Sequence, residues 1–382
     1  MLISVKRLRS RIRSRAFVYL RCGAKTAAFL FWATLYMAVM KMTIFKSSVN
    51  TPPVKDWSAL PDNYSMWLFQ SQTKEELETN GDNVWLAPDN ATFIELDQRL
   101  DKVQEVCRMR NLFTQKINNK EFFVDQKHRL VWCNIFKAAS SYWLYYFNIL
   151  GGYDKKFLQK SKSQPLNLAR KKFPRPSADD LKAALKTPGV LSLLVVREPF
   201  VRLLSAYRDK LEIQIKPFYR KLAKSIISKY RQTTIALFGK PKLSGPTFYE
   251  FVQYLIDQNK SPGYEFNEHW APYYQFCSPC AVNFSVIAKV ETLDKDSMYV
   301  IQQLQLGKVL DVKVGERRRK QRYLMNLSRD GKNTTALLKH YFSQLDEYML
   351  NDLLKIYGVD FEMFGYDADI YKSYVRKPQL KV

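Results

Sequence analysis

The chain has 382 residues, of which 46% are hydrophobic and 14% aromatic, with only 13 glycines. This length and composition suit one large catalytic domain with accessory segments, and they exclude wholesale disorder and fibrous architectures. The 61 Lys and Arg residues against 36 Asp and Glu give a net charge of +25, which predicts an anionic partner such as nucleic acid, membrane lipid or an acidic metabolite or polymer.

A basic segment followed by an apolar segment opens the sequence. Residues 1–25 carry eight Lys and Arg and no acid, and residues 26–45 contain one charge, Lys41, near their far end. A run of this length can span a bilayer as a helix. We expect a cytosolic tail at 1–25 and an uncleaved type II transmembrane anchor at 26–45, with the rest of the chain lumenal. A cleaved signal peptide or a buried core helix is the alternative.

Two features agree with a lumenal location. Six Asn-x-Ser/Thr sequons follow the anchor, at Asn63, Asn90, Asn259, Asn283, Asn326 and Asn333. Cys22 lies on the expected cytosolic side. The other four cysteines form an even set on the lumenal side, namely Cys107, Cys133, Cys277 and Cys280. Disulfides are expected among these four. The Cys-x-x-Cys pair could instead bind zinc, but a single pair and three histidines in the chain disfavour a metal site.

Residues 46–91 contain four prolines and no sustained periodicity, so we interpret them as a stem. A helical pattern begins at Thr92, with one face made of Leu96, Leu100, Val103 and Cys107. No internal repeat or Gly/Ser linker divides the remainder. We therefore expect one catalytic domain at 92–382.

The first motif lies at residues 129–150. Residues 129–136 predict a buried strand, and small residues at 138–141 precede an aromatic-rich helix that runs to Leu150. Small residues let a backbone approach an anion, the new helix offers unpaired N–H groups, and Lys137 adds charge. This pattern is not a Walker A loop, because G-x-x-x-x-G-K-[ST] is absent. It predicts a phosphate site, with an ordinary helix start as the alternative.

The second motif lies at residues 190–211. Residues 190–197 predict a buried strand, and Pro199 suits the first turn of the next helix. The apolar stripe of that helix is Phe200, Leu203, Leu204, Tyr207 and Leu211, and the residues outside it are Arg202, Ser205, Arg208 and Asp209. Arg197 ends the strand at the edge where open α/β sheets bind ligands, which suits a second phosphate. A surface arginine paired with Glu198 is the alternative.

These two segments, VDQKHRLVWCNIFKAASSYW and VVREPFVRLLSAYRDKLE, resemble the nucleotide-binding signatures of the Golgi carbohydrate sulfotransferases, which act on chondroitin, dermatan, N-acetylgalactosamine and the HNK-1 epitope. Two further blocks, FNEHWAPYYQFCSPCAVNFSVIAKVETLDKD and IYGVDFEMFGY, are similar as well, so the resemblance covers roughly residues 105–366. It implies an α/β fold: a P-loop-like core with a central parallel sheet flanked by helices. It also implies 3′-phosphoadenylyl sulfate (PAPS) as the donor.

The resemblance also implies site residues. The donor 5′-phosphosulfate would be bound by the first loop, made of Lys137, Ala138, Ala139, Ser140, Ser141 and Tyr142. Arg197 and Ser205 would bind the 3′-phosphate. One departure stands out, because the family usually has proline before the lysine and a Val-Gly-Cys-Thr-like loop, whereas this chain has Phe136 before the lysine and Ala-Ala-Ser-Ser after it.

Sulfuryl transfer to a sugar hydroxyl needs a base and a cation at the bridging oxygen of the donor. We expect Lys137 to supply the cation, and no metal, since lysine and helix amides can stabilise the leaving phosphate. His269 is the preferred base, because histidine titrates near neutrality and this one matches a family His-Trp element. The alternatives are Glu268, Glu212 and Glu198. The family's Cys-x-Pro-Cys implies a Cys277–Cys280 bridge, which leaves Cys107 to pair with Cys133.

Three basic windows follow the anchor. Residues 154–175, 213–242 and 308–322 carry eight, eight and seven Lys and Arg against one, none and two acids. They are either solvated loops or a groove for a polyanion. Because a lumenal enzyme does not meet nucleic acid, the expected acceptor is an anionic glycan, in particular chondroitin-type N-acetylgalactosamine, with the 4-O position favoured by the resemblance. The alternative is a non-catalytic lumenal glycosaminoglycan-binding protein on a sulfotransferase scaffold.

Overall fold

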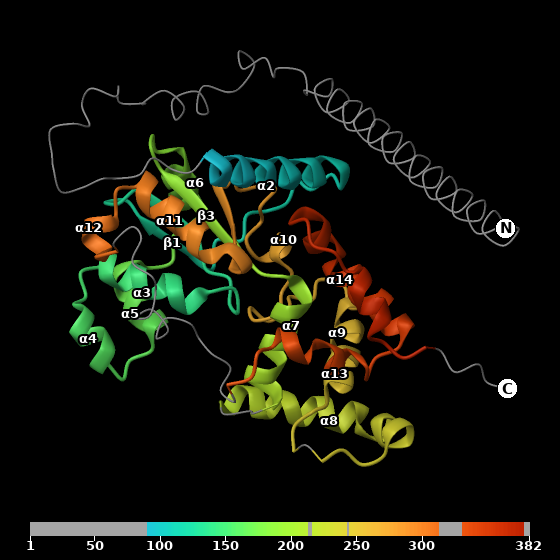
Figure 1. Ribbon diagram of the computed structural model, residues 1–382. Helices are drawn as coiled ribbons and strands as arrows, with labels where there is room; N and C mark the ends of the chain where they lie inside the picture. The colour runs from blue at the N-terminus through green and yellow to red at the C-terminus, as the bar shows by residue number, and fades with distance from the viewer. Residues whose placement is uncertain (1–89, 213–215, 243, 313–330, 378–382) are drawn as a thin grey trace, which may run out of the picture. The chain divides into compact units, whose positions relative to one another are not determined.

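The computed structural model describes residues 90–212, 216–242, 244–312 and 331–377 (Figure 1). The expected tail, anchor and nearly all of the stem lie outside these residues. So do the sequons at Asn63 and Asn326 and most of the basic window at 308–322. Among the residues that the structure describes, no helix is long and apolar enough to cross a membrane.

A four-stranded sheet in the order β1-β2-β3-β4 forms the centre of the described chain. Its strands are Phe122–Asp125, Leu130–Cys133, Leu191–Val196 and Val286–Lys289. Strands β2, β3 and β4 are parallel. All residues of β2 and β3 are buried, as expected of parallel strands covered on both faces, so the strands predicted at 129–136 and 190–197 are confirmed in shorter form.

The expected central parallel sheet is confirmed for β2, β3 and β4, but at one edge β1 pairs antiparallel with β2. Only four residues, 126–129, join the two strands, and a connection that short permits an antiparallel pair but no parallel crossover. The turn ends at Arg129, whose φ of 52° lies in the left-handed region.

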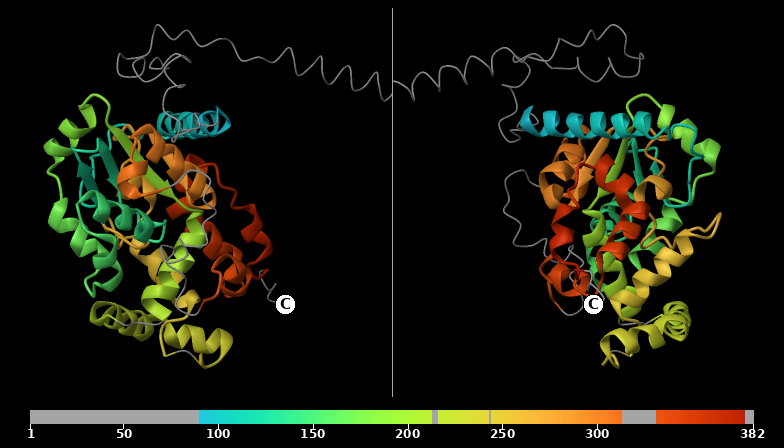
Figure 2. Two further views of the ribbon diagram at one scale, coloured as in Figure 1. Left: turned by 60° about the vertical axis from the view of Figure 1, so that its left-hand side comes forward. Right: turned by 90° about the vertical axis from the view of Figure 1, so that its right-hand side faces the viewer.

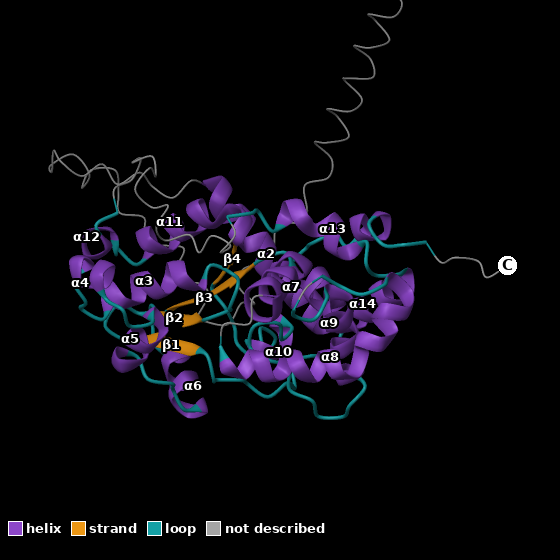
Figure 3. Cartoon of the chain, turned by 90° about the horizontal axis from the view of Figure 1, so that it is seen from below, coloured by secondary structure: helices purple, strands orange, loops and turns teal. Residues whose placement is uncertain are grey.

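Helices cover both faces of the sheet, as Figure 3 shows for α3 and α11 on one side and α6 on the other. One face packs on α3 (Ser140–Leu150), α5 (Pro165–Lys172), α11 (Leu293–Gln303) and α12 (Gly307–Leu310). The opposite face packs on α2 (Asn90–Met109), α6 (Ala178–Lys186) and α10 (Tyr273–Phe276). The short helix α4 (Lys155–Lys160) follows α3.

A third hydrophobic cluster, besides those on the two faces of the sheet, contains no strand residue. Its helices are α7 (Pro199–Tyr207), α8 (Pro217–Phe238), α9 (Phe248–Asn259), α13 (Leu338–Phe342) and α14 (Glu347–Met363). Short helical turns complete the described chain, namely η3 (Arg208–Glu212), η4 (Val290–Thr292), η6 (Thr335–Leu337) and η7 (Asp369–Ser373). Helix α7 belongs to this cluster and follows directly on β3, so it links the sheet to the helical part (Figure 1).

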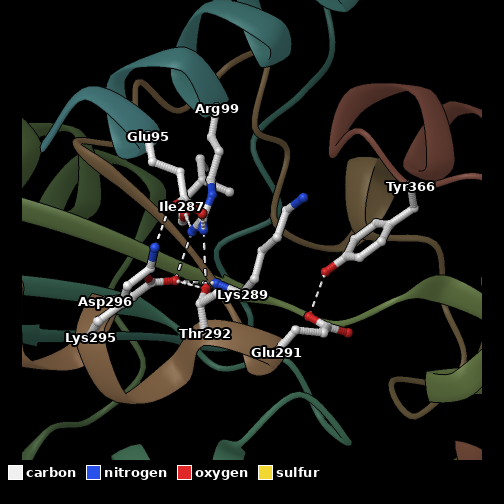
Figure 4. A network of polar contacts seen from close by, with 9 residues as sticks. All are labelled: Glu95, Arg99, Ile287, Lys289, Glu291, Thr292, Lys295, Asp296 and Tyr366. Carbon is white, nitrogen blue, oxygen red and sulfur yellow. Dashed lines mark hydrogen bonds and ion pairs between the residues drawn. The ribbon is translucent and has the colours of Figure 1, made fainter. Parts of the chain in front are cut away.

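Helix α2 confirms the amphipathic pattern predicted from Thr92, although it begins at Asn90. It packs against β4, α11 and α14 (Figure 2). Arg99 on this helix donates hydrogen bonds to the Asp296 carboxylate at 2.7 Å and to the Ile287 carbonyl at 3.0 Å. Figure 4 shows this network, in which the fully buried Asp296 also accepts from the backbone N–H of Lys289 at 2.9 Å. The network fixes α2 to the end of β4.

The structure forms two disulfides, Cys107–Cys280 and Cys133–Cys277, so the expected pairing of Cys277 with Cys280 is wrong. Cys277 directly follows α10, and the chain then turns through Ser278, whose φ is 49°, so the two thiols reach different elements. Cys277 joins the last residue of β2, and Cys280 joins α2. The Cα separations of 6.1 and 5.5 Å suit a disulfide. Because Cys277 and Cys280 are both in disulfides, the alternative of a zinc site at this pair is wrong as well.

Candidate active site

The loop between β2 and α3 lies at the carboxyl edge of the sheet. Lys137 and Ala139 both adopt positive φ, at 68° and 57°. Among the described residues, no hydrogen bond uses the backbone N–H groups of Ala139, Ser140 or Ser141. Consecutive free amides at a helix start form an anion-binding concavity, so the loop fits the expected phosphosulfate. The N–H of Tyr142, in contrast, is donated to the Ala139 carbonyl at 3.0 Å.

At Ala139 the departure from the family loop has a physical consequence for the backbone. It precedes α3 with φ 57° and ψ 23°, a left-handed conformation that suits glycine, and it stands where the family loop has glycine.

Replacing Ala139 by glycine is expected to raise the free energy of unfolding by about 0.5–1 kcal/mol, because relief of the Cβ strain exceeds the added entropy of the unfolded chain. Urea unfolding measures the change. The control is Ala183→Gly, in the middle of α6, where glycine should destabilise by a similar amount. A lower stability of Ala139→Gly would contradict the strain argument.

Lys137 points toward the π-helical turn η3. Its Nζ lies 3.3 Å from Oδ2 of Asp209, and the Nζ of Lys210 lies 2.9 Å from the same oxygen. Burial lowers the pKa of Lys137, Asp209 opposes that shift, and the nearby charges of Lys210 and Arg197 add to it. The predicted catalytic cation is therefore half-buried and sits in a cluster of charges that sequence reasoning missed.

Arg197 follows the last residue of β3, and its backbone is fixed on both sides. Its N–H donates to the hydroxyl of Tyr273 at 3.0 Å, and that hydroxyl donates to the Arg197 carbonyl at 2.7 Å. The guanidinium donates to the Lys137 carbonyl at 3.4 Å, so the two predicted donor-binding segments touch. Glu198 does not pair with Arg197 but caps α7, where its carboxylate accepts from the N–H of Val201.

The other predicted donor contacts differ in exposure. Ser205 is half-buried on α7, and Ser140 and Ser141 are half-buried at the start of α3. Tyr142 lies on α3 and is buried, and its hydroxyl accepts a hydrogen bond from Tyr146 of the same helix at 3.0 Å. Its phenol therefore belongs to the core, and its N–H is already engaged, so its predicted contact with the donor has no support in the geometry.

Arg202 lies outside the apolar stripe of α7 but is only 1% exposed. Its guanidinium donates to the carbonyl of Phe136 at 2.9 Å and to those of Ala271 and Glu268 at 2.7 and 3.3 Å. It also lies 4.6 Å from the ring centroid of Tyr273. Arg202 therefore ties the loop before Lys137 to the segment that carries His269.

His269 lies beside this loop, as the prediction requires. Its ring stacks on Phe136 with centroids 4.6 Å apart, so the aromatic residue that stands in place of the family's proline contacts the predicted base. Its Nδ1 lies 3.0 Å from both the Tyr219 hydroxyl and the Asn267 side-chain oxygen. Sequence reasoning missed Tyr219, because its link to His269 spans 50 residues.

The alternative bases occupy different environments. Glu268 lies 3.6 Å from Nδ1 of His269, and burial raises the pKa of its half-exposed carboxyl. Burial also raises the pKa of Glu198, to about 7, but this carboxylate caps α7. Glu212 accepts a hydrogen bond from Tyr341 at 2.7 Å. Of the three, Glu268 is the one in direct contact with His269.

Burial, with the charges of Lys210 and Lys137 as further causes, lowers the pKa of His269 to about 2. The ring is neutral at physiological pH. Below about pH 6.5 the unfolded chain takes up a proton that the folded state does not, so His269 makes stability fall as pH drops from 6.5 toward 2.

Replacing His269 by glutamine is expected to lower kcat by about 100-fold, because a positioned base contributes at least that much. It should also reduce the stability difference between pH 7.5 and 5.0. Initial rates and urea unfolding at the two pH values check both effects. Near-normal turnover in the variant would remove His269 from the mechanism.

The family model described as the sulfotransferase family matches residues 120–367. The chain belongs to the sulfotransferase family. The matched range includes the loop after β2, the end of β3, η3 and His269. The expected family and enzyme class, a PAPS-dependent O-sulfotransferase, are confirmed.

The relatives of this sulfotransferase carry consistent names. Carbohydrate sulfotransferase 11 of Mus musculus is 29% identical over 285 residues, which is 72% of this chain and 76% of the relative. Carbohydrate sulfotransferase 12 of Xenopus laevis is 29% identical over 273 residues, 65% of this chain and 61% of the relative. Carbohydrate sulfotransferase 8 of Homo sapiens is 28% identical over 253 residues, 65% of this chain and 57% of the relative. No solved structure matches the chain significantly.

A cavity of about 290 Å³ lies away from this site. It is lined by residues at the amino ends of the parallel strands and by α6, among them Val190 and Ala184. Ligands of open α/β sheets bind at the carboxyl ends of the strands. We therefore assign the sulfotransferase site to the loops at that edge and not to this cavity.

Proposed function

We propose that this sulfotransferase transfers a sulfuryl group from PAPS to a hydroxyl of an anionic glycan, with chondroitin-type N-acetylgalactosamine and its 4-O position as the preferred acceptor. The observation that carries the donor half is the contact between the two donor segments, where Lys137 and Arg197 meet beside three free amides. These groups fit an anion with two phosphate-bearing ends.

In the proposed reaction the acceptor oxygen forms a bond to sulfur while the bond between sulfur and the bridging phosphate oxygen breaks. Lys137 and the amides of Ala139, Ser140 and Ser141 stabilise the charge that develops on the leaving phosphate. His269 takes the acceptor proton. The anionic donor would offset the lysine charges that now lower the pKa of His269, and this makes the ring a stronger base in the complex.

The basic face of α8 supports a polyanionic acceptor. In the first half of the helix, Arg220, Lys221 and Lys224 are exposed and have no acidic partner among the described residues. In the second half, Lys229 and Arg231 pair with carboxylates at 2.9 and 2.6 Å. The unpaired half begins beside Tyr219, which contacts His269. Phe218, the residue before Tyr219, is 63% exposed. We propose that this half binds the acceptor.

The double substitution Arg220→Ser/Lys224→Ser is expected to raise KM for a chondroitin polymer about tenfold, since each exposed ion pair contributes about 0.2–1 kcal/mol. KM for the donor should stay the same, and activity should depend less on salt. Initial rates at several salt concentrations measure these effects. Lys127→Ser/Lys186→Ser removes equal charge at the far edge of the sheet and serves as the control. Equal KM values for both double variants would contradict the acceptor role.

The window at 154–175 supports acceptor binding less well. Lys155 pairs with Asp311 at 2.8 Å, and both Arg170 and Arg175 pair with Glu121, at 3.0 and 2.6 Å. Several of its charges are therefore already neutralised.

We further propose a type II Golgi membrane protein with a lumenal catalytic domain. The basic tail and apolar run support this topology, and two disulfides suit an oxidising lumen. The sequon asparagines Asn259, Asn283 and Asn333 are exposed and could carry glycans.

A labelled-donor transfer assay on a panel of desulfated polysaccharides tests the proposed function. Donor-dependent labelling, highest on chondroitin, is the expected result. The second candidate, a non-catalytic glycan-binding protein, is favoured by the strained, altered loop at Ala139. It predicts salt-sensitive binding to the same polymers without label transfer.

A further inference from the structure

The carboxylate of Asp209 lies between two lysine amines at the candidate active site. Oδ2 of Asp209 is 3.3 Å from Nζ of Lys137 and 2.9 Å from Nζ of Lys210. The side chains of both lysines are 13% exposed and that of Asp209 is 20% exposed. Three charges thus share a largely dehydrated site, where they interact more strongly than they would in water.

Asp209 reaches this position from η3, the π-helical turn at the end of α7. Such turns are rare and often occur at functional sites. Lys210 of the same turn lies over the ring of Tyr219, with Nζ 5.5 Å from the centroid. The turn therefore contributes a carboxylate and a cation to one cluster, next to the residue that contacts His269.

The charges that face Lys137 act in opposite directions. Lys210 and Arg197 are cations, and His269 is neutral, so Asp209 is the anion that opposes the loss of the Lys137 proton. Burial alone already lowers the pKa of Lys137. Without the Asp209 carboxylate, two cations and a dry environment would both favour the neutral amine.

We propose that Asp209 is a positioning residue that keeps Lys137, the first residue of the donor loop, protonated and holds its amine in place. The proposal rests on the proposed function, in which Lys137 binds the donor as a cation. Its ligand class is a nucleotide that carries phosphate on two positions.

Asp257 offers a matched comparison within the same chain. Its carboxylate also bridges two lysines, with Lys229 at 2.9 Å and Lys260 at 3.4 Å. There, however, the lysine side chains are 61% and 70% exposed, so water screens the pair. A carboxylate that is important only for local stability should behave alike in both places.

The test measures binding of adenosine 3′,5′-bisphosphate, the product nucleotide, by calorimetry from pH 7.5 to 10, above the range in which its phosphates titrate. In the unsubstituted protein, affinity should fall only at the alkaline end. In Asp209→Asn the fall should begin at least about one pH unit lower. At pH 7.5 the affinity of this variant should be close to that of the unsubstituted protein. Asp257→Asn should keep the unsubstituted profile.

Two further variants keep the test decisive if Asp209→Asn folds poorly. Lys137→Arg should lose the alkaline fall, because a guanidinium stays charged without a neighbouring carboxylate. In a Lys137→Ala background, adding Asp209→Asn should cause no further loss of affinity. An unshifted alkaline fall in Asp209→Asn, or an unchanged one in Lys137→Arg, overturns the proposal. If the unsubstituted protein binds no nucleotide, the proposed function fails instead.

Discussion

Replacing Lys137 by alanine is expected to lower kcat for sulfuryl transfer by about 1,000-fold, at the upper end of what one stabilising donor contributes in a dehydrated site. Lys137 opens the loop that carries the free amides, where the leaving phosphate would gain charge, and its side chain is 13% exposed. Water that fills the space of the lost side chain cannot replace a fixed cation. Initial rates with labelled donor on a desulfated chondroitin measure the loss.

Two comparisons make this result specific. Lys127→Ala removes an exposed lysine at the far edge of the sheet and should leave kcat unchanged. The thermal midpoint of Lys137→Ala should stay close to that of the unsubstituted protein, because the lost amine leaves behind no buried acceptor that depends on it alone. If turnover stays within tenfold of normal, Lys137 does not stabilise the leaving group.

Replacing Arg202 by alanine is expected to reduce the free energy of unfolding by about 3–5 kcal/mol, because each buried carbonyl left without its donor costs about 1–3 kcal/mol. The substitution leaves the carbonyls of Phe136 and Ala271 without their donor and opens a cavity against Tyr273. Transfer should be lost as well, since the loop before Lys137 loses its connection to the His269 segment. Urea unfolding and initial rates measure the two effects.

Two substitutions bracket this result. Arg202→Lys keeps the charge but not the planar fork of donors, so it should cost less stability while still impairing transfer. Arg110→Ala removes a 54% exposed arginine that pairs with Glu362, and should cost less than about 1 kcal/mol. A stability loss below that level for Arg202→Ala would show that the three carbonyls find other partners.

Much of the sheet and the donor loops could be predicted from sequence, because parallel strands buried on both faces leave continuous apolar runs. The strand at Leu191–Val196 and the helix after Pro199 are examples. The antiparallel edge strand Phe122–Asp125 was missed, since four residues beside a polar turn leave little signal.

The site residues that the sequence did not predict were missed for one physical reason. Arg202 looked solvent-facing from the helix period, yet the segment that contains Ala271 covers that side of α7. Asp209 and Tyr219 meet Lys137 and His269 across long stretches of chain, which no local pattern reports. The cysteine pairing was wrong for the same reason, because the Cys-x-x-Cys spacing says nothing about a helix and a strand that approach from elsewhere.

The two disulfides also impose an order on how the chain can mature. Their cysteines are separated by 173 and 144 residues, so each correct partner emerges from the ribosome roughly ten to thirty seconds after the first cysteine. Cys107 and Cys133 are exposed to oxidation together throughout that delay, and Cys277 and Cys280 are made almost simultaneously. The incorrect Cys107–Cys133 pair is therefore available before either native pair. Efficient production should depend on a thiol–disulfide isomerase, and expression in a reducing compartment should yield a less stable protein.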